Sequence, residues 1–304
     1  MISRYTHHNT IWVDMESPTK EEILHIMEEF SVPDLVGEEL VSSTLRSKVE
    51  LYDNLVYVIL HFPESRNKGR HSEQEIDFII GKNFLITVRY DKIDPVHEFS
   101  KLFETASMVD REKVSSHGGY IFVQMMKELY KTSMVEMEEL TKVVREIEDS
   151  IFIGKEEDLV RKISHTSRKL LDFKQALRFH RDILKSYESS SIRLFGSEYG
   201  YYANLVTSEF NKVNSILESN SDALSELQRT NDSLLSMKQN SVMKKFTVIS
   251  FVTFPLMLIT GIFGMNTGPD IIFINSSSHF FFVIGAMLLT SLVMFIFFRI
   301  HKWL

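Results

Sequence analysis

One stretch of the sequence repeats small, polar and thioether side chains at alternating gaps of three and four residues. Its members are Asn240, Met243, Thr247, Ser250, Phe254, Met257, Gly261 and Gly264. Such gaps place residues on one face of an α-helix, so these side chains form a stripe, which we call the polar stripe. The other faces of this stretch are mostly Val, Ile, Leu and Phe. A stripe of this kind either lines an aqueous path or packs against a second helix, and the spacing leaves both open.

If the stripe lines an aqueous path, the residues around it favour passage of a hydrated hard cation. No carboxylate, imidazole or thiol occurs from Phe246 to Asn266. Zn²⁺ prefers direct nitrogen or sulfur ligands, whereas Mg²⁺ keeps its waters, which donate to amide and backbone oxygens. The 11 histidines are scattered, and the sequence has no catalytic triad, metalloprotease motif or Gly-x-x-x-x-Gly-Lys phosphate loop. We therefore do not expect an enzyme.

Two uncharged runs near the C-terminus have the length of membrane-spanning helices. Phe246–Phe263 contains 18 residues and Phe280–Phe298 contains 19, close to the roughly 20 that cross about 30 Å of hydrocarbon. Pro255 is tolerated in such a helix because neighbouring groups can satisfy the carbonyl that it frees. The polar stripe runs along the first span. Two spans of one chain cannot enclose an aqueous path, so a pore requires a ring of subunits in the membrane lipid.

Basic residues predict the orientation of the spans. Lys244 and Lys245 precede the first span. Arg299, His301 and Lys302 follow the second, and the loop between the spans has no Lys or Arg. The positive-inside rule therefore places both termini in the cytoplasm and the loop outside.

The charge of the chain lies almost entirely before the spans. The whole chain has a net charge of −7, yet residues 246–304 contain only Asp270, Arg299 and Lys302 as charged side chains. No basic face is present that would bind nucleic acid. Cysteine is absent, which excludes disulfides and thiolate zinc sites.

The first hundred or so residues read as a mixed α/β domain. Ser17 or Thr19 is suited to cap a helix through residues 23–30. Strands are expected at residues 10–14, 52–62, 75–80 and 84–90, with Gly81-Lys82-Asn83 as a tight hairpin turn. From about 120 to 190 the pattern is helical and rich in Glu, and Ile151–Gly154 interrupts it, which predicts an antiparallel pair of helices. The acids form either a solvated face or a collar that concentrates cations.

A single long helix is expected from about residue 200 to 263. It contains no glycine between Gly200 and Gly261 and no proline before Pro255, and its length would be on the order of 95 Å. Its first part carries a seam with gaps of three and four, namely Phe210, Val213, Leu217, Asn220, Leu224, Leu227, Asn231 and Leu234. Such a seam packs helices side by side, either between chains or within one chain.

The motif Gly264-Met265-Asn266 follows the first span. Here the sequence resembles the CorA family of divalent metal cation (magnesium, cobalt and zinc) transporters, whose signature is Gly-Met-Asn after the first of two C-terminal spans. The resemblance covers residues 240–304, including Pro255 and the closing Lys302-Trp303-Leu304. More weakly it reaches Trp12-Val13-Asp14, Arg46-Ser47-Lys48, Tyr52-Asp53 and residues 81–88.

The resemblance implies an α+β membrane protein that assembles as a funnel-shaped homopentamer. It also implies that the pentamer conducts a hydrated divalent cation, and Mg²⁺ is the ion that we expect. Gly264, Met265 and Asn266 would form an outer ion-binding ring, and Asn240 and Met243 would lie near an inner constriction. The bacterial inner (plasma) membrane is the expected location, and no organic cofactor is expected. The expected parts are a cytoplasmic α/β domain (1–119), an acidic helical pair (120–190), a stalk helix (191–245), the pore-lining span (246–266), an external loop (267–278), a second span (279–298) and a basic cytoplasmic tail (299–304).

Two departures from the family pattern leave alternatives open. After the motif the loop reads Thr267-Gly268-Pro269-Asp270, in which Asp270 is the only acid that would attract cations. A glycine soon after Gly-Met-Asn resembles the sequences of the zinc-handling branch of the family. A zinc or cobalt transporter is therefore an alternative. Residues 201–205 lack the aspartate that family members use for magnesium sensing between subunits, and Glu209 is the remaining candidate for a regulatory metal ligand. An alternative of another class is a membrane-tethered coiled-coil scaffold or signalling protein without conduction.

Overall fold

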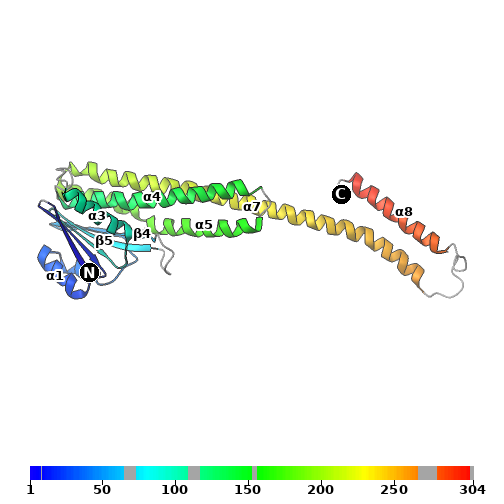
Figure 1. The fold of residues 1–304 in the computed structure, drawn as a ribbon, viewed down its shortest axis with the longest axis horizontal. Helices are drawn as coiled ribbons and strands as arrows, with labels where there is room; N and C mark the ends of the chain where they lie inside the picture. The colour runs from blue at the N-terminus through cyan, green and yellow to red at the C-terminus, as the bar shows by residue number, and fades with distance from the viewer. Residues whose placement is uncertain (8, 65–72, 109–116, 153–155, 266–278, 302–304) are drawn as a thin grey trace. The chain divides into compact units, whose positions relative to one another are not determined.

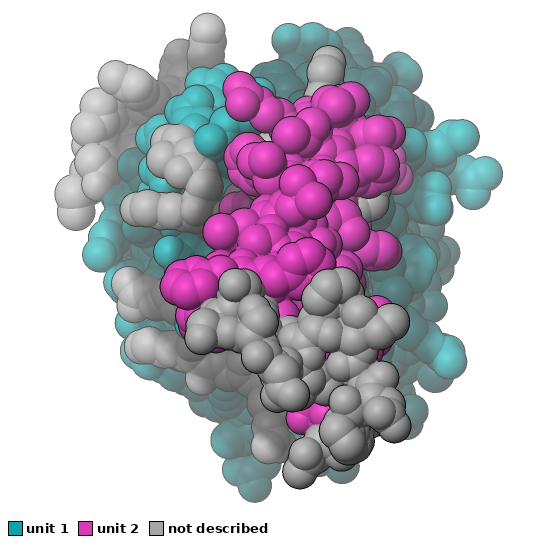
Figure 2. Space-filling view, turned by 90° about the vertical axis from the view of Figure 1, so that its right-hand side faces the viewer, with its two compact units in different colours: residues 1–228 teal, residues 229–304 magenta. Residues whose placement is uncertain are grey.

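The structure is a computed structural model that describes residues 1–304 except 8, 65–72, 109–116, 153–155, 266–278 and 302–304 (Figure 1). Packing divides the chain into two compact units, residues 1–228 and residues 229–304 (Figure 2). The seven parts expected from the sequence are a finer division than these two units, and their boundaries stay predictions.

A six-stranded mixed sheet forms the centre of the first unit. Its strands are β1 (Ile2–His7), β2 (Thr10–Glu16), β3 (Lys48–Leu51), β4 (Leu55–Pro63), β5 (Glu73–Gly81) and β6 (Phe84–Arg89), in the order β1-β2-β6-β5-β4-β3. Only β2 and β6 are parallel; the other neighbours are antiparallel. The four predicted strands are confirmed, and Lys82 and Asn83 connect β5 to β6 as expected. Strands β1 and β3, at the two edges of the sheet, were not predicted.

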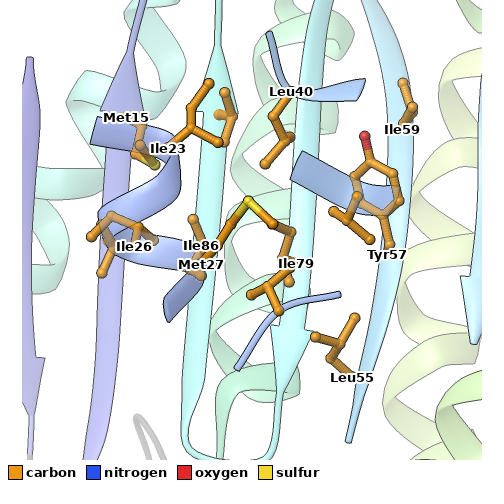
Figure 3. Packing of buried hydrophobic residues seen from close by; sticks show 14 residues of the cluster. Met15, Ile23, Ile26, Met27, Leu40, Leu55, Tyr57, Ile59, Ile79 and Ile86 are labelled. Carbon is orange, nitrogen blue, oxygen red and sulfur yellow. The ribbon is translucent and has the colours of Figure 1, made fainter. Parts of the chain in front are cut away.

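Two short helices cover one face of the sheet. The first, α1 (Lys20–Phe30), begins with a capping box, in which the Thr19 hydroxyl accepts from the Glu22 amide at 3.2 Å and the Glu22 carboxylate accepts from the Thr19 amide at 2.8 Å. The second is α2 (Asp34–Glu39). Figure 3 shows Ile23, Ile26 and Met27 of α1 packed over strand residues such as Ile79 and Ile86. This cluster fixes the two helices on the sheet.

The other face of the sheet packs against a layer of longer helices. These are α3 (Asp94–Met108), α4 (Gly118–Ser150), α5 (Glu156–Leu177) and α6 (His180–Phe195). Phe78 of β5 meets Phe122 of α4 edge-on at 5.0 Å between ring centroids. Gly118 begins α4 so close to the sheet that an added Cβ would lie 2.0 Å from the Phe84 carbonyl oxygen. The predicted interruption after residue 150 is confirmed by the end of α4, while residues 153 and 154 lie outside the described part.

Helix α7 (Tyr199–Gly264) is continuous over 66 residues, or about 100 Å. A second apolar helix, α8 (His279–Ile300), follows. In the first unit the seam of α7 packs within one chain: Phe210, Leu217 and Leu224 are buried, and the Asn220 amide donates to the Thr141 hydroxyl of α4 at 2.9 Å. The seam up to Leu224 is therefore an intrachain contact.

Candidate functional site

The C-terminal part of α7 and the whole of α8 have the composition of membrane spans. Their most apolar windows have mean hydropathies of 2.1 and 2.6. With 22 residues, α8 is about 33 Å long, enough to cross about 30 Å of hydrocarbon. Both helices expose large apolar side chains along their length. Such a surface is unfavourable in water and favourable in contact with lipid.

The polar stripe lies on an open face of α7. Met243, Phe254 and Met257 are each at least 60 % exposed. Asn240, Gly261 and Gly264 are also exposed, and Thr247 and Ser250 are half-buried. The Thr247 hydroxyl donates to the Met243 carbonyl at 2.9 Å, so its proton is engaged and its oxygen lone pairs point away from the helix as acceptors.

Helix α8 covers a different face of the same span. Val248 is nearly buried, and the Phe251 ring meets Phe298 of α8 at 6.3 Å between centroids. The half-buried Val252 and Ile259 continue this face at helical spacing. At about 100° per residue, Val248, Val252 and Ile259 lie on roughly the side of α7 opposite to the polar stripe. The ring contact with the second span therefore lies on another face of α7 than the stripe.

The C-terminal end of the stripe consists of two exposed glycines. Gly261 and Gly264 occupy the last turn of α7, and a Cβ added at either position would meet nothing within 4 Å. Nothing in the surrounding chain therefore requires glycine there, although glycine costs a helix about 0.5–1 kcal/mol relative to alanine. The last carbonyls of a helix lack intrahelical partners and carry a partial negative charge. The C-terminal end of α7 is therefore expected to carry a partial negative charge.

The structure does not test the roles of the remaining predicted site residues. Met265 is 62 % exposed just beyond α7, and Asn266 and Asp270 lie outside the described residues. Glu209 is on the part of α7 in the first unit, where it pairs with Lys212 at 2.8 Å. Among the described residues, no group of three or more His, Asp or Glu side chains lies close enough to hold a metal ion. The roles of Met265, Asn266, Asp270 and Glu209 stay predictions.

The structure also reveals buried acids that the sequence analysis missed. Glu75 and Asp77 lie on the same face of β5 and are almost fully buried. Asp14 of β2 is also buried and pairs with Arg89 of β6 at 2.9 Å. The signal was present in the segment Glu73–Ile80, where acids occupy every second position of an apolar strand. That period places them on one face of the sheet.

Comparisons with known proteins agree with the fold and the paired spans. The profile of a family described as CorA-like Mg2+ transporter protein matches residues 8–300. The cobalt/magnesium transport protein CorA of Thermotoga maritima is 23 % identical over 96 % of this chain and 83 % of its own length. A putative metal ion transporter of Bacillus subtilis, YfjQ, is 24 % identical over 96 % of this chain and 88 % of its own. The complete structure of the CorA magnesium transporter of Methanocaldococcus jannaschii superposes with a TM-score of 0.82 at 20 % identity, covering 99 % of this chain and 93 % of that one.

Proposed function

The chain belongs to the family of CorA-like Mg2+ transporter proteins, and from that premise we propose that it conducts hydrated Mg²⁺ through a pore formed by a ring of identical chains. Membership makes it a divalent metal transporter of the membrane and not an enzyme. The ion, the number of subunits and the residues of the pore are the content of the proposal. Co²⁺ or Zn²⁺ is the alternative cargo.

The observation that carries the proposal is the free face of α7. In the part of the chain that the structure describes, the ring contact with α8 lies on another face of α7, yet the stripe contains two hydroxyls and a glycine inside an apolar span. Polar groups in a span are costly next to lipid, so they favour facing water or another protein chain. In a ring of chains that turn this face inward, the polar groups face water and other copies of the chain and not lipid. The family resemblance implies five chains in the ring.

The groups along the stripe suit an ion that keeps its water. At the outer end, the backbone oxygens of Gly264 and Met265 and the amide oxygen of Asn266 would accept hydrogen bonds from waters of the ion. Phe254 and Met257 would form an apolar narrowing deeper in the span, and Asn240 and Met243 an inner constriction. Asp270, on the loop, would raise the cation concentration at the entrance.

The membrane potential is a sufficient driving force for uptake. Moving one charge across 100 mV is worth about 2.3 kcal/mol, so a divalent ion gains about 4.6 kcal/mol. The basic residues at the ends of the spans favour both termini on the cytoplasmic side of the inner membrane. Binding of cytoplasmic Mg²⁺ near Glu209 is the regulatory part of the proposal.

The proposal is tested by ion uptake into proteoliposomes containing the wild-type chain or Asn266→Ala. We expect Mg²⁺ flux in the wild type and its loss in the variant. The matched control is Asn214→Ala, an asparagine of α7 outside the span that bonds Glu218 of the same helix at 2.8 Å, and it should conduct normally. Flux of Zn²⁺ without Mg²⁺ would move the chain to the zinc branch. Absence of flux for every ion would favour the scaffold and contradict the proposal.

A further inference from the structure

Two acids with neighbouring carboxyl groups are buried in the cytoplasmic sheet, far along the sequence from the spans. Glu75 and Asp77 occupy successive inward positions of β5, on the face covered by α1 and α2. Asp77 is fully buried and Glu75 is 6 % exposed. A pair of buried carboxylates of like charge is unfavourable unless something neutralises it.

One oxygen of each carboxyl group is well satisfied by hydrogen-bond donors. The hydroxyls of Tyr57 and Tyr90 donate to Asp77 Oδ2 at 3.3 and 3.2 Å. The Thr44 amide donates to Glu75 Oε2 at 2.6 Å, and His61 Nε2 lies 3.2 Å from the same oxygen. These contacts fix the two carboxyl groups in place.

The other two oxygens, Asp77 Oδ1 and Glu75 Oε1, are buried and have no hydrogen-bond partner among the residues that the structure describes. Glu75 and Asp77 are two residues apart on one strand, so their side chains are neighbours on the same face of the sheet. A buried acceptor without a donor is costly, and one proton between the groups removes both deficiencies at once. A proton shared between the two carboxyl groups therefore explains both why their free oxygens lack donors and why two acids are buried side by side.

We propose that Glu75 and Asp77 form a proton-binding site, in which protonated Asp77 donates from Oδ1 to Oε1 of Glu75. The proton is assigned to Asp77 because it is the more deeply buried of the two acids and, among the described residues, only phenol hydroxyls donate to it. Burial and then the charge of Glu75 raise the pKa of Asp77 well above its usual range. The site is independent of the proposed conduction path.

The surrounding groups support a proton and not a metal cation. The groups that contact the pair from β4, β6 and the segment before β3 are donors, namely two phenols, an imidazole and a backbone amide, whereas a cation requires acceptors. Further out, Lys48 of β3 is engaged by Glu39 of α2 at 2.6 Å and by Glu50 at 3.0 Å. Burial lowers the pKa of His61, but hydrogen bonds to Glu75 and the Thr44 carbonyl outweigh it, so that pKa is raised overall. The raised pKa favours the charged form of His61, which faces Glu75.

The site makes the stability of the sheet depend on pH in a definite direction. In the unfolded chain Asp77 loses its proton near pH 4, whereas the folded chain keeps it to higher pH. The folded state then binds more protons, so stability falls as pH rises through that interval, by up to about tenfold in the folding equilibrium constant per pH unit. Loss of the proton at higher pH places two like charges beneath α1 and α2.

The direct test is infrared spectroscopy of the full-length protein in detergent at pH 7. We expect the carbonyl band of a protonated carboxyl group in the wild type, lost in Asp77→Asn and kept in the control Glu73→Gln, whose carboxyl is only partly buried on the same strand. A wild type without this band, or a band that survives in Asp77→Asn, would overturn the proposal. Disappearance of the band on addition of Mg²⁺ at constant pH would overturn it in favour of a cation site.

A second measurement separates the proton from the shape of the side chain. Asp77→Asn keeps the size of the side chain and supplies an N–H donor to Glu75 Oε1, so the variant should fold. Unfolding of the full chain, followed by Trp12 fluorescence from pH 5 to 9, should show the wild type losing stability relative to Asp77→Asn as pH rises. A difference between the two chains that is independent of pH would contradict the proposal.

Discussion

The two units of the chain treat their polar groups in opposite ways. In residues 1–228 they are joined in buried networks: the Trp12 indole donates to the Thr87 hydroxyl at 3.0 Å, and that hydroxyl donates to Asp14 at 2.7 Å. In residues 229–304 the Thr247 hydroxyl bonds only its own helix, and Phe254 and Phe281 are 67 % and 74 % exposed.

This difference shows which unit is complete in a single chain. Apart from a few buried atoms such as the Glu75 and Asp77 oxygens, the sheet and its helices satisfy their own polar groups and bury their own core, so the chain alone explains most of their sequence. The spans do not: their apolar surface requires lipid, and their polar stripe requires water or other copies of the chain. Function is accordingly expected where the single chain leaves its sequence unexplained.

The largest effect should come from filling the stripe. Gly261→Phe should reduce Mg²⁺ flux at least about 100-fold, because a ring of added aromatic side chains would close a path shared by several chains. The chain itself has space at this position, so the variant should still fold. The control Ile262→Phe lies one residue away on another face and should keep most of its flux in the same proteoliposome assay. Equal flux in Gly261→Phe and the wild type would contradict the claim that the polar stripe lines the path of the ion.

The next effect concerns the completeness of the first unit. Arg89→Met would leave the Asp14 carboxylate buried without its cation and should destabilise the domain by about 3–5 kcal/mol. Adding Asp14→Asn to this variant removes the uncompensated charge and should recover part of the loss. Denaturant unfolding followed by Trp12 fluorescence measures both, and a loss below about 1 kcal/mol for Arg89→Met would contradict the assignment of this pair.

A buried histidine gives the first unit a dependence on acid pH. Burial lowers the pKa of His180 to about 4; one ring nitrogen lies 2.7 Å from the Tyr130 hydroxyl and the other 2.7 Å from the His61 carbonyl oxygen. Between about pH 6.5 and 4 the unfolded chain binds the proton and the folded chain does not. Stability should therefore fall by about 3 kcal/mol as pH decreases through this window.

His180→Gln isolates this contribution, because it removes the titrating group from the same position. Its stability should change less with pH than that of the wild type between pH 6.5 and 4. The control His165→Gln, at an exposed position of α5, should retain the wild-type dependence. Equal slopes for His180→Gln and the wild type would show that His180 does not titrate as described.

The smallest effect is local. Thr19→Ala removes the side-chain oxygen that caps α1 and should cost about 1 kcal/mol, visible in the same unfolding experiment. Ser42→Ala, at an exposed position after α2, should change stability by less than half as much. If Thr19→Ala were as stable as the wild type, the packing of α1 on the sheet, and not the cap, would determine where the helix begins.

The sequence was informative where the signal is long or strongly apolar. The spans, the four inner strands and the continuous α7 were predicted from hydropathy, alternation and the absence of glycine and proline. Strands β1 and β3 were missed because edge strands are partly exposed and β3 has only four residues, so pairing with a neighbour, and not local pattern, forms them.

The candidate site divides in a similar way. Helical spacing predicted the polar stripe, but only the fold shows that α8 packs on the opposite side of α7. Periodicity did not distinguish an intrachain seam from one between chains; the Asn220–Thr141 contact does. The Glu75–Asp77 pair was missed because burial of an acid depends on which helices cover the sheet.

The central claim, that the polar stripe faces water shared by several chains, is tested most directly by cysteine accessibility. The chain contains no cysteine, so Ser250→Cys and Val252→Cys each introduce a single thiol, one on the stripe and one on the face toward α8. Mg²⁺ flux through the Ser250→Cys protein should be blocked by a charged, membrane-impermeant thiol reagent, and flux through Val252→Cys should not. Block of both variants alike, or a Ser250→Cys protein that conducts normally after treatment, would contradict the account.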